Sequence, residues 1–208
     1  MTGIPAISAY TLPESGQLPP NIPRWTIDPA RAVFLIHDMQ RYFLRPLREA
    51  GLDAPLIRNL RAIRDYALEH DMQVAYTAQP GGMSRDERGL LRDFWGDGMQ
   101  VAPEDRAVID ELAPEDRDWV FKKWRYSAFW KSDLQLRMRA HRRDQLIIGG
   151  VYAHIGILTT ALESFSHDIE TFVVADATAD FSLERHLMAL EHAARCCAVV
   201  LTTAEVVQ

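Results

Sequence analysis

Short, continuous apolar runs alternate along this chain with longer segments of helical spacing, and this alternation restricts the fold more than any other feature. The apolar runs fall at 32–36, 73–77, 119–121, 145–148, 171–174 and 198–201. Strands that are apolar on successive residues suit a sheet with both faces covered, as parallel sheets have. We therefore expect a buried parallel sheet at the centre of the fold.

The segments between the runs predict the helices that would cover this sheet. Ser182 can cap the last of them. Apolar residues recur at helical spacing in the segments 54–69, 132–141, 154–165 and 182–195. Strand–helix alternation with short links predicts an α/β fold of three layers, a parallel sheet sandwiched between helices. The stretch 80–118 is harder to assign, and its PGG and GDG sequences are interpreted as turns around a short helix.

Composition divides the chain into an N-terminal arm, 1–30, and a domain, 31–208. The arm holds six prolines, and because proline fixes φ and lacks an N–H donor, we expect extended chain that wraps over the domain or a partner subunit. The arm has neither the basic start nor the apolar core of a secretory signal. No apolar stretch reaches the roughly 18 residues that a membrane helix needs.

The charge balance limits the possible partners. A net charge of −6 gives no bulk attraction to nucleic acid or to an anionic membrane, so we expect neither partner, and any anionic ligand needs a local cluster of bases. The two cysteines, Cys196 and Cys197, are adjacent, which rarely satisfies disulfide geometry. We expect both to be small buried residues of a cytoplasmic protein.

Polar residues follow four of the apolar runs, and open parallel sheets bind ligands beyond the carboxyl ends of their strands. The sequences at these ends are HDMQ at 37–40, AQP at 78–80, KKWRY at 122–126 and GGVYAHIG at 149–156. Since these ends meet at one edge of a parallel sheet, we expect the functional site there.

Two of these residues suggest proton-transfer chemistry. A lone aspartate such as Asp38 is more often a helix cap or a turn residue, but Lys123 ends another strand of the same sheet. A lysine beside a partly desolvated carboxyl can tune and orient it for proton transfer. Only one of Lys122 and Lys123 needs to point inward, because neighbours on a strand face opposite sides.

Other residues at this edge could hold an anion. Arg88 and Arg125 are candidate carboxylate clamps, although a single arginine is more often part of a surface ion pair. Gln79 could donate a hydrogen bond to a substrate oxygen or simply close the turn before Pro80. The glycines of 149–156 suggest exposed backbone N–H groups near a helix that starts at about His154, which is equally consistent with a tight turn.

Several reaction classes lack their motifs. The seven histidines and two cysteines form no HExxH and no Cys–His ligand spacing, so we expect no metal. There is no GxGxxG and no GxxxxGK[ST], which leaves nucleotide binding without support, and we expect no cofactor. No GxSxG elbow is present either, which argues against a serine hydrolase.

Six segments together resemble the isochorismatase family, in order, at the family's spacing and over nearly the whole chain. They are HDMQRYF at 37–43, YTAQP at 76–80, LLRDFWGDGM at 90–99, KWRYSAF at 123–129, GGVYAHIG at 149–156 and VADATADFS at 174–182. The first and fourth segments are highly specific. The resemblance implies a six-stranded parallel sheet flanked by helices, with the site at the strand ends.

The resemblance also implies roles for individual residues. The wider superfamily includes cysteine hydrolases with an aspartate, a lysine and a nucleophilic cysteine, and these positions fall on Asp38, Lys123 and Gly156. A glycine cannot be a nucleophile, so amide hydrolysis through a thioester is excluded, and isochorismatases, which carry this glycine, hydrolyse a vinyl ether. In the superfamily, the bond between Val151 and Tyr152 would be a cis peptide.

The expected reaction needs one well-placed acid and a desolvated pocket, without a covalent intermediate. Asp38 would protonate the methylene carbon of an enolpyruvyl ether, and Lys123 would position Asp38 or the substrate. The residues expected to bind this small anionic substrate are Gln79, Arg88, Tyr126, Tyr152 and the Gly156 backbone, with Tyr42 and Phe43 as the apolar wall.

Two substrates compete within the family. The single-domain phenazine type cleaves 2-amino-2-deoxyisochorismate, and the siderophore type cleaves isochorismate and usually carries a carrier domain. We favour the phenazine type because the sequence ends at Gln208 and because the arm and HDMQRYFLRPL look closer to it, although TLPES and AHIG also suit the siderophore type. A non-catalytic docking protein is the alternative outside enzymes, and a homodimer is expected from the resemblance alone.

Overall fold

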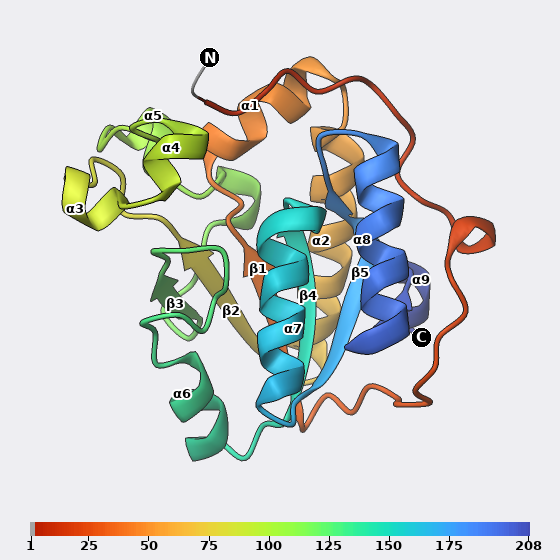
Figure 1. Ribbon diagram of the computed structural model, residues 1–208. Coiled ribbons are helices and arrows are strands. Elements are labelled where there is room, and N and C mark those ends of the chain that lie inside the picture. The colour runs from red at the N-terminus through yellow and green to blue at the C-terminus, as the bar shows by residue number, and fades with distance from the viewer. Residues whose placement is uncertain (1–2) are drawn as a thin grey trace.

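The six predicted strands form one fully parallel sheet in the order β3-β2-β1-β4-β5-β6. The structure is a computed structural model that describes residues 3–208. The strands are β1 (Ala32–His37), β2 (Gln73–Ala78), β3 (Trp119–Lys122), β4 (Gln145–Val151), β5 (Glu170–Ala179) and β6 (Val199–Leu201). The expected three-layer α/β fold is thus confirmed (Figure 1).

Helices cover both faces of this sheet (Figure 1). They are α1 (Arg41–Glu49), α2 (Asp53–Glu69), α3 (Arg85–Arg88), α4 (Leu91–Trp95), α5 (Pro103–Arg106), α6 (Leu134–Ala140), α7 (Leu158–Ser166), α8 (Leu183–Cys196) and α9 (Thr203–Val206). The four predicted helices correspond to α2, α6, α7 and α8, and the Ser182 hydroxyl accepts from the backbone N–H of Arg185 as the predicted cap. Among residues 3–208, no helix is long and apolar enough to cross a membrane.

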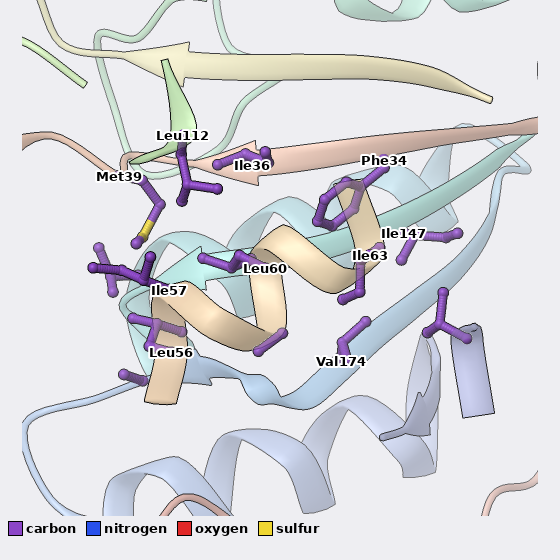
Figure 2. Packing of buried hydrophobic residues seen from close by; sticks show 14 of the residues in the cluster. Phe34, Ile36, Met39, Leu56, Ile57, Leu60, Ile63, Leu112, Ile147 and Val174 are labelled. Atoms are coloured by element: carbon purple, nitrogen blue, oxygen red, sulfur yellow. The ribbon is translucent and has the colours of Figure 1, made fainter. Parts of the chain in front are cut away.

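Alternate residues of β1 face two separate cores, which explains why the strand is apolar on successive positions. Phe34 and Ile36 pack against α2, whereas Val33 and Leu35 pack in the core beneath α6, α7 and α8. Figure 2 shows Leu60 of α2 beside β4, where it approaches Gly149. Each large apolar side chain buried in this way contributes about 1.5–3 kcal/mol to stability.

Two helical regions differ from the expectations. α1 was not predicted, because Pro46 lies inside it and its polar residues hide the apolar spacing of Leu44 and Leu47. The stretch 80–118 holds three short helices, α3 to α5, and a 3-10 turn at Asp110–Leu112 rather than one helix. These elements are too short to show a helical period in sequence.

The N-terminal segment runs as extended chain over the domain, with one 3-10 turn at Ser15–Gln17 (Figure 1). The Asn21 amide donates to the carbonyl of Val200 and accepts from its N–H, so it satisfies the outer side of edge strand β6. The Tyr10 hydroxyl accepts from the N–H of Asp180 at 2.8 Å and lies 3.1 Å from Nδ1 of His186. Ile4 reaches the cavity described below.

The chain proceeds from β1 towards β3 on one side and from β4 towards β6 on the other. A crevice outside the strand ends is expected where the direction of winding reverses, between β1 and β4. Because these strands are parallel, the carboxyl ends of β1, β2, β3 and β4 lie next to this crevice. At the other end of the sheet, Cys197 is buried as expected but Cys196 is exposed, because the C-terminal turn of α8 presents it to solvent.

Candidate active site

A cavity of about 600 Å³, partly open to solvent, lies at the carboxyl ends of β1 to β4. All nine residues singled out from the sequence line it: Asp38, Tyr42, Phe43, Gln79, Arg88, Lys123, Tyr126, Tyr152 and Gly156. Arg125 also lines it, as do residues from the arm and from α4. Parallel pairing brings these positions together, since His37 is level with Thr77 and with Gly150.

Asp38 and Lys123 form a buried ion pair at the floor of this cavity. Lys123 Nζ lies 2.7 Å from Asp38 Oδ2, and the two residues are 3% and 4% exposed. The Thr77 hydroxyl donates to Asp38 Oδ1 at 2.7 Å and accepts from the Asp38 N–H. Asp38 has a left-handed φ of 53°, which turns the chain sharply after β1 and leaves its carboxyl facing the neighbouring strands.

Two opposing effects act on the pKa of Asp38. Burial by itself raises this pKa, because it disfavours the charged carboxylate. The charge of Lys123, with the hydrogen bonds from Lys123 and Thr77, outweighs burial and lowers the pKa below its ordinary value. The free site therefore holds an ionised aspartate at neutral pH.

Strand geometry separates the two adjacent lysines as expected. Lys123 points into the cavity, whereas Lys122 is exposed and lies 5.3 Å from the centre of the Trp124 ring. The sequence KK offered two candidates, and the alternation of the strand selected one of them.

Arg88 is a buried cation without an acidic partner. It is 6% exposed, and within residues 3–208 no carboxylate lies in salt-bridge range of its guanidinium. Its Nε donates to the Gly96 carbonyl and its Nη1 to Oε1 of Gln79 at 3.3 Å. A Cβ at Gly98 would lie 2.7 Å from its Cζ, so that glycine makes room for it. Burial lowers the pKa of Arg88, because it disfavours the charged guanidinium, and a bound anion would offset this cost.

Gln79 is held by a neighbour that the sequence analysis did not single out. The fully buried Gln40 donates to the Gln79 carbonyl at 2.9 Å and accepts from the Gln79 N–H at 2.8 Å. The Gln79 amide oxygen accepts from Arg88, so its NH2 group remains as the donor for a ligand.

Aromatic side chains form the apolar wall. Phe43 packs edge-on against Tyr42 and Tyr152, and the Tyr152 hydroxyl donates to the Phe43 carbonyl at 2.6 Å. That hydroxyl is therefore already used within the protein. The Tyr126 hydroxyl accepts from the indole N–H of Trp95 at 2.8 Å, which leaves its own proton to donate elsewhere.

The turn after β4 differs in detail from the simple helix start expected from the sequence. The Val151–Tyr152 peptide is cis, as the resemblance implies. Residues Ala153–Ile157 form a π-helical turn, and the His154 N–H donates to the Asp180 carboxylate at 2.7 Å. That N–H is thus not free for a ligand, whereas Gly156 does line the cavity.

Sequence reasoning gave no role to His37, Thr77, Gln40 or Trp95, although each contacts a cavity residue or lines the cavity. A signal existed, because all four lie inside the quoted motifs HDMQRYF, YTAQP and LLRDFWGDGM. Their side-chain partners are distant in sequence, so only the folded chain reveals their contacts.

Chemically, the cavity joins the carboxyl of Asp38 and the ammonium of Lys123 to two guanidinium groups, those of Arg88 and Arg125, in an apolar surround. Within residues 3–208, no three His, Cys, Asp or Glu side chains are grouped as metal ligands. Neither cysteine lines the cavity. Asp38 is therefore the group in place for proton transfer, while Arg88 and Lys123 can hold a substrate with carboxylates.

Comparison with known proteins gives a consistent result. The family model of the isochorismatase domain matches residues 32–205. The chain is 57% identical to phenazine biosynthesis protein PhzD1 of Pseudomonas aeruginosa, over the whole of both chains. It is 50% identical to the isochorismatase of Bacillus subtilis, over 96% of this chain and 64% of the relative. A cysteine hydrolase structure from Pseudomonas syringae shares the fold with a TM-score of 0.82 at 24% identity, over 91% of this chain and 96% of the other.

Proposed function

The chain belongs to the isochorismatase family, and from this premise we propose that it hydrolyses the enolpyruvyl ether of 2-amino-2-deoxyisochorismate. The products are pyruvate and trans-2,3-dihydro-3-hydroxyanthranilate, and the protein is a hydrolase of phenazine or related antibiotic biosynthesis. The observation that carries this proposal is one cavity that joins a buried carboxyl–ammonium pair to an uncompensated buried arginine.

The reaction consists of one proton transfer followed by addition of water. Asp38 gives a proton to the methylene carbon of the enol ether, which forms an oxocarbenium ion. Water adds to the cationic carbon and loses a proton, which restores the proton count. The resulting hemiketal collapses with cleavage of its bond to the ring oxygen, so that pyruvate and a ring alcohol leave.

Asp38 is ionised in the free site and must acquire a proton before it can act as the acid. The substrate carries two carboxylates, and Arg88 and Lys123 are the cations placed to receive them. A carboxylate beside Lys123 offsets the charge that holds the Asp38 pKa low, and burial of Asp38 then favours the protonated form. We propose that substrate binding in this way converts Asp38 from a base to an acid.

The 57% identity to PhzD1 over the whole of both chains supports 2-amino-2-deoxyisochorismate over isochorismate as the substrate. The Bacillus isochorismatase relative is less similar to this chain, which makes isochorismate the second candidate. A docking role without catalysis is disfavoured, because the Asp38–Lys123 pair and Arg88 are intact.

Pyruvate release provides the test. A coupled lactate dehydrogenase assay on each substrate should give a higher kcat/KM for 2-amino-2-deoxyisochorismate. Equal or greater turnover of isochorismate would assign the siderophore-type reaction instead, and no pyruvate from either would refute the proposal. Replacement of Arg88 by Met should raise KM at least about tenfold, since a charged hydrogen bond is lost.

We further propose that the protein acts in the cytoplasm as a homodimer. Both cysteines are free thiols, which suits a reducing compartment. Leu162 and Phe165, one turn apart on α7, are 38% and 49% exposed, and a second copy that covers them would bury apolar surface. Light scattering after gel filtration should give twice the 23.7 kDa mass of one chain.

A further inference from the structure

His37 lines the cavity and is fully buried, yet the proposed reaction gives it no part in proton transfer. It is the last residue of β1 and lies directly before Asp38, with its Nδ1 3.9 Å from Asp38 Oδ2. A titratable side chain in this place needs a physical explanation.

The Val151 carbonyl determines which nitrogen of the His37 ring carries the proton. Nδ1 lies 2.8 Å from the Val151 carbonyl, which can only accept, so Nδ1 carries the proton. The Thr160 hydroxyl accepts from the N–H of Ala128 at 3.0 Å and is 3.4 Å from His37 Nε2. A neutral ring therefore accepts at Nε2 and donates at Nδ1, and it ties together the segment after β3, helix α7 and the end of β4.

The electrostatic surroundings agree with this neutral form. Burial, followed by the charge of Lys123, lowers the pKa of His37 to about 4. A second cation beside Lys123 would hold the Asp38 carboxylate ionised still more strongly. A neutral His37 ring adds no second positive charge beside the Asp38 carboxylate.

The ring also occupies the space that a side chain at residue 156 would need. A Cβ built on Gly156 would overlap Cε1 of His37 and would lie 3.0 Å from Nε2 and 3.3 Å from Nδ1. A shift of the ring away from residue 156 would disturb its contacts with the Val151 carbonyl at Nδ1 and the Thr160 hydroxyl at Nε2. Position 156 can therefore hold only a glycine while His37 keeps its place.

We propose that His37 is a positioning residue that fixes the Val151 carbonyl and, through its ring, excludes any side chain from position 156. It thereby keeps this side of the cavity free of a nucleophile such as cysteine or serine, so that Asp38 has only the substrate to protonate. The residue at 37 in this way determines the class of reaction that the site can perform. This inference rests on the proposed function for the role of Asp38 and for its activity readout, whereas the steric coupling of residues 37 and 156 does not depend on it.

A double-mutant cycle between residues 37 and 156 tests the proposal. His37→Asn retains an amide donor near the place of Nδ1 but lacks the atoms that crowd residue 156. We expect Gly156→Ala to lower the melting temperature and to reduce kcat/KM by about tenfold or more, since overpacking of a rigid site is costly. In the H37N background the same change should cost much less, which makes the two substitutions non-additive.

A second pair of variants separates positioning from packing alone. His37→Gln keeps polar atoms near the place of Nε2 but loses the donor to the Val151 carbonyl. We expect H37Q to raise KM at least about fivefold relative to H37N, because Val151 and Tyr152 both line the cavity. Equal KM values for the two variants would show that His37 only fills space.

The outcomes remain interpretable if one variant does not fold. Should H37N be unfolded, Gly156→Ala and Gly156→Ser in the wild-type background must still lower the melting temperature in order of side-chain size. Wild-type stability and activity in G156A, or strict additivity in the cycle, would overturn the proposal. Absence of pyruvate release from the wild-type protein would instead refute the proposed function, while the thermal coupling between residues 37 and 156 would still be measurable.

Discussion

Two buried aspartates at the same edge of the sheet have different surroundings. Asp38 directly follows β1 and Asp180 directly follows β5, and they are 4% and 0% exposed. Asp180 accepts from the backbone N–H groups of His154 and Phe181 and is bonded to the His154 ring. The donors to the Asp38 carboxyl are two side chains, those of Lys123 and Thr77.

The difference between the two sets of donors explains which buried carboxyl can react. Backbone donors are fixed by the fold, so Asp180 is held as a permanent tie between the turns that follow β4 and β5. Asp38 faces the cavity, and its main partner is an ammonium group that a bound anion can draw away. The same residue type is therefore structural in one place and reactive in the other because of its donors and its access to ligand.

The largest effect should come from the reactive carboxyl itself. Asp38→Asn keeps the shape but removes the acid, and kcat for pyruvate release should fall by about 10²–10⁴. Lys123 then lacks its carboxylate, so the assay must be run at a temperature where circular dichroism shows a folded protein. Turnover within tenfold of wild type would exclude Asp38 as the acid.

Substitution of Asp180 should affect stability more than activity. Asp180→Ala leaves one buried and one partly buried N–H group without an acceptor, and the free energy of unfolding should fall by about 2–5 kcal/mol. Below the melting transition, kcat should stay within about threefold of wild type. Urea denaturation measures the loss, with Asp116→Ala at an exposed position as the matched control. A D180A variant with native stability would remove the contrast between the two aspartates.

Activity and stability should respond to pH in opposite directions. Because the pKa of Asp38 is lowered in the folded protein, the acid form becomes more abundant as pH falls, and kcat/KM should rise by up to about tenfold per pH unit. The ion pair stabilises the fold above the unfolded pKa of about 3.9, and this contribution is lost as pH falls through the lower folded pKa. A pH–rate profile and melting curves from pH 3 to 8 (~5 pH units) test both trends.

Lys123→Met is the matched variant for this experiment. Without the ammonium group, burial raises the pKa of Asp38, so the limb of the kcat/KM profile should move to higher pH. An unchanged profile would mean that Lys123 does not control the protonation of Asp38.

The smallest expected effect concerns the second donor. Thr77→Val removes one of the hydrogen bonds that lower the Asp38 pKa, so the limb of the kcat/KM profile should move to higher pH, by less than in Lys123→Met. Thr77→Ser retains the hydroxyl and should stay near wild type. If T77S and T77V shift the profile equally, packing rather than the hydrogen bond is responsible.

The local pattern of the sequence was sufficient to predict much of the fold. Six apolar runs predicted six strands because burial on both faces is recorded in every successive residue of a strand such as β1. The rule for strand ends, together with the resemblance, identified nine residues that all line one cavity. The sequence pattern did not predict α1, in which Pro46 interrupts the helical spacing. It also did not predict the three separate helices of 80–118, which are too short to show a helical period.

The sequence by itself therefore determined the layers, the sheet edge that carries the site and the types of side chain there. Only the tertiary structure decided that Asp180 is held by backbone donors, that Arg88 has no acid beside it, and that the ring of His37 fills the space at Gly156. The physical reason is that strand burial is a local property, whereas charge pairing and steric exclusion depend on atoms brought together from distant parts of the chain.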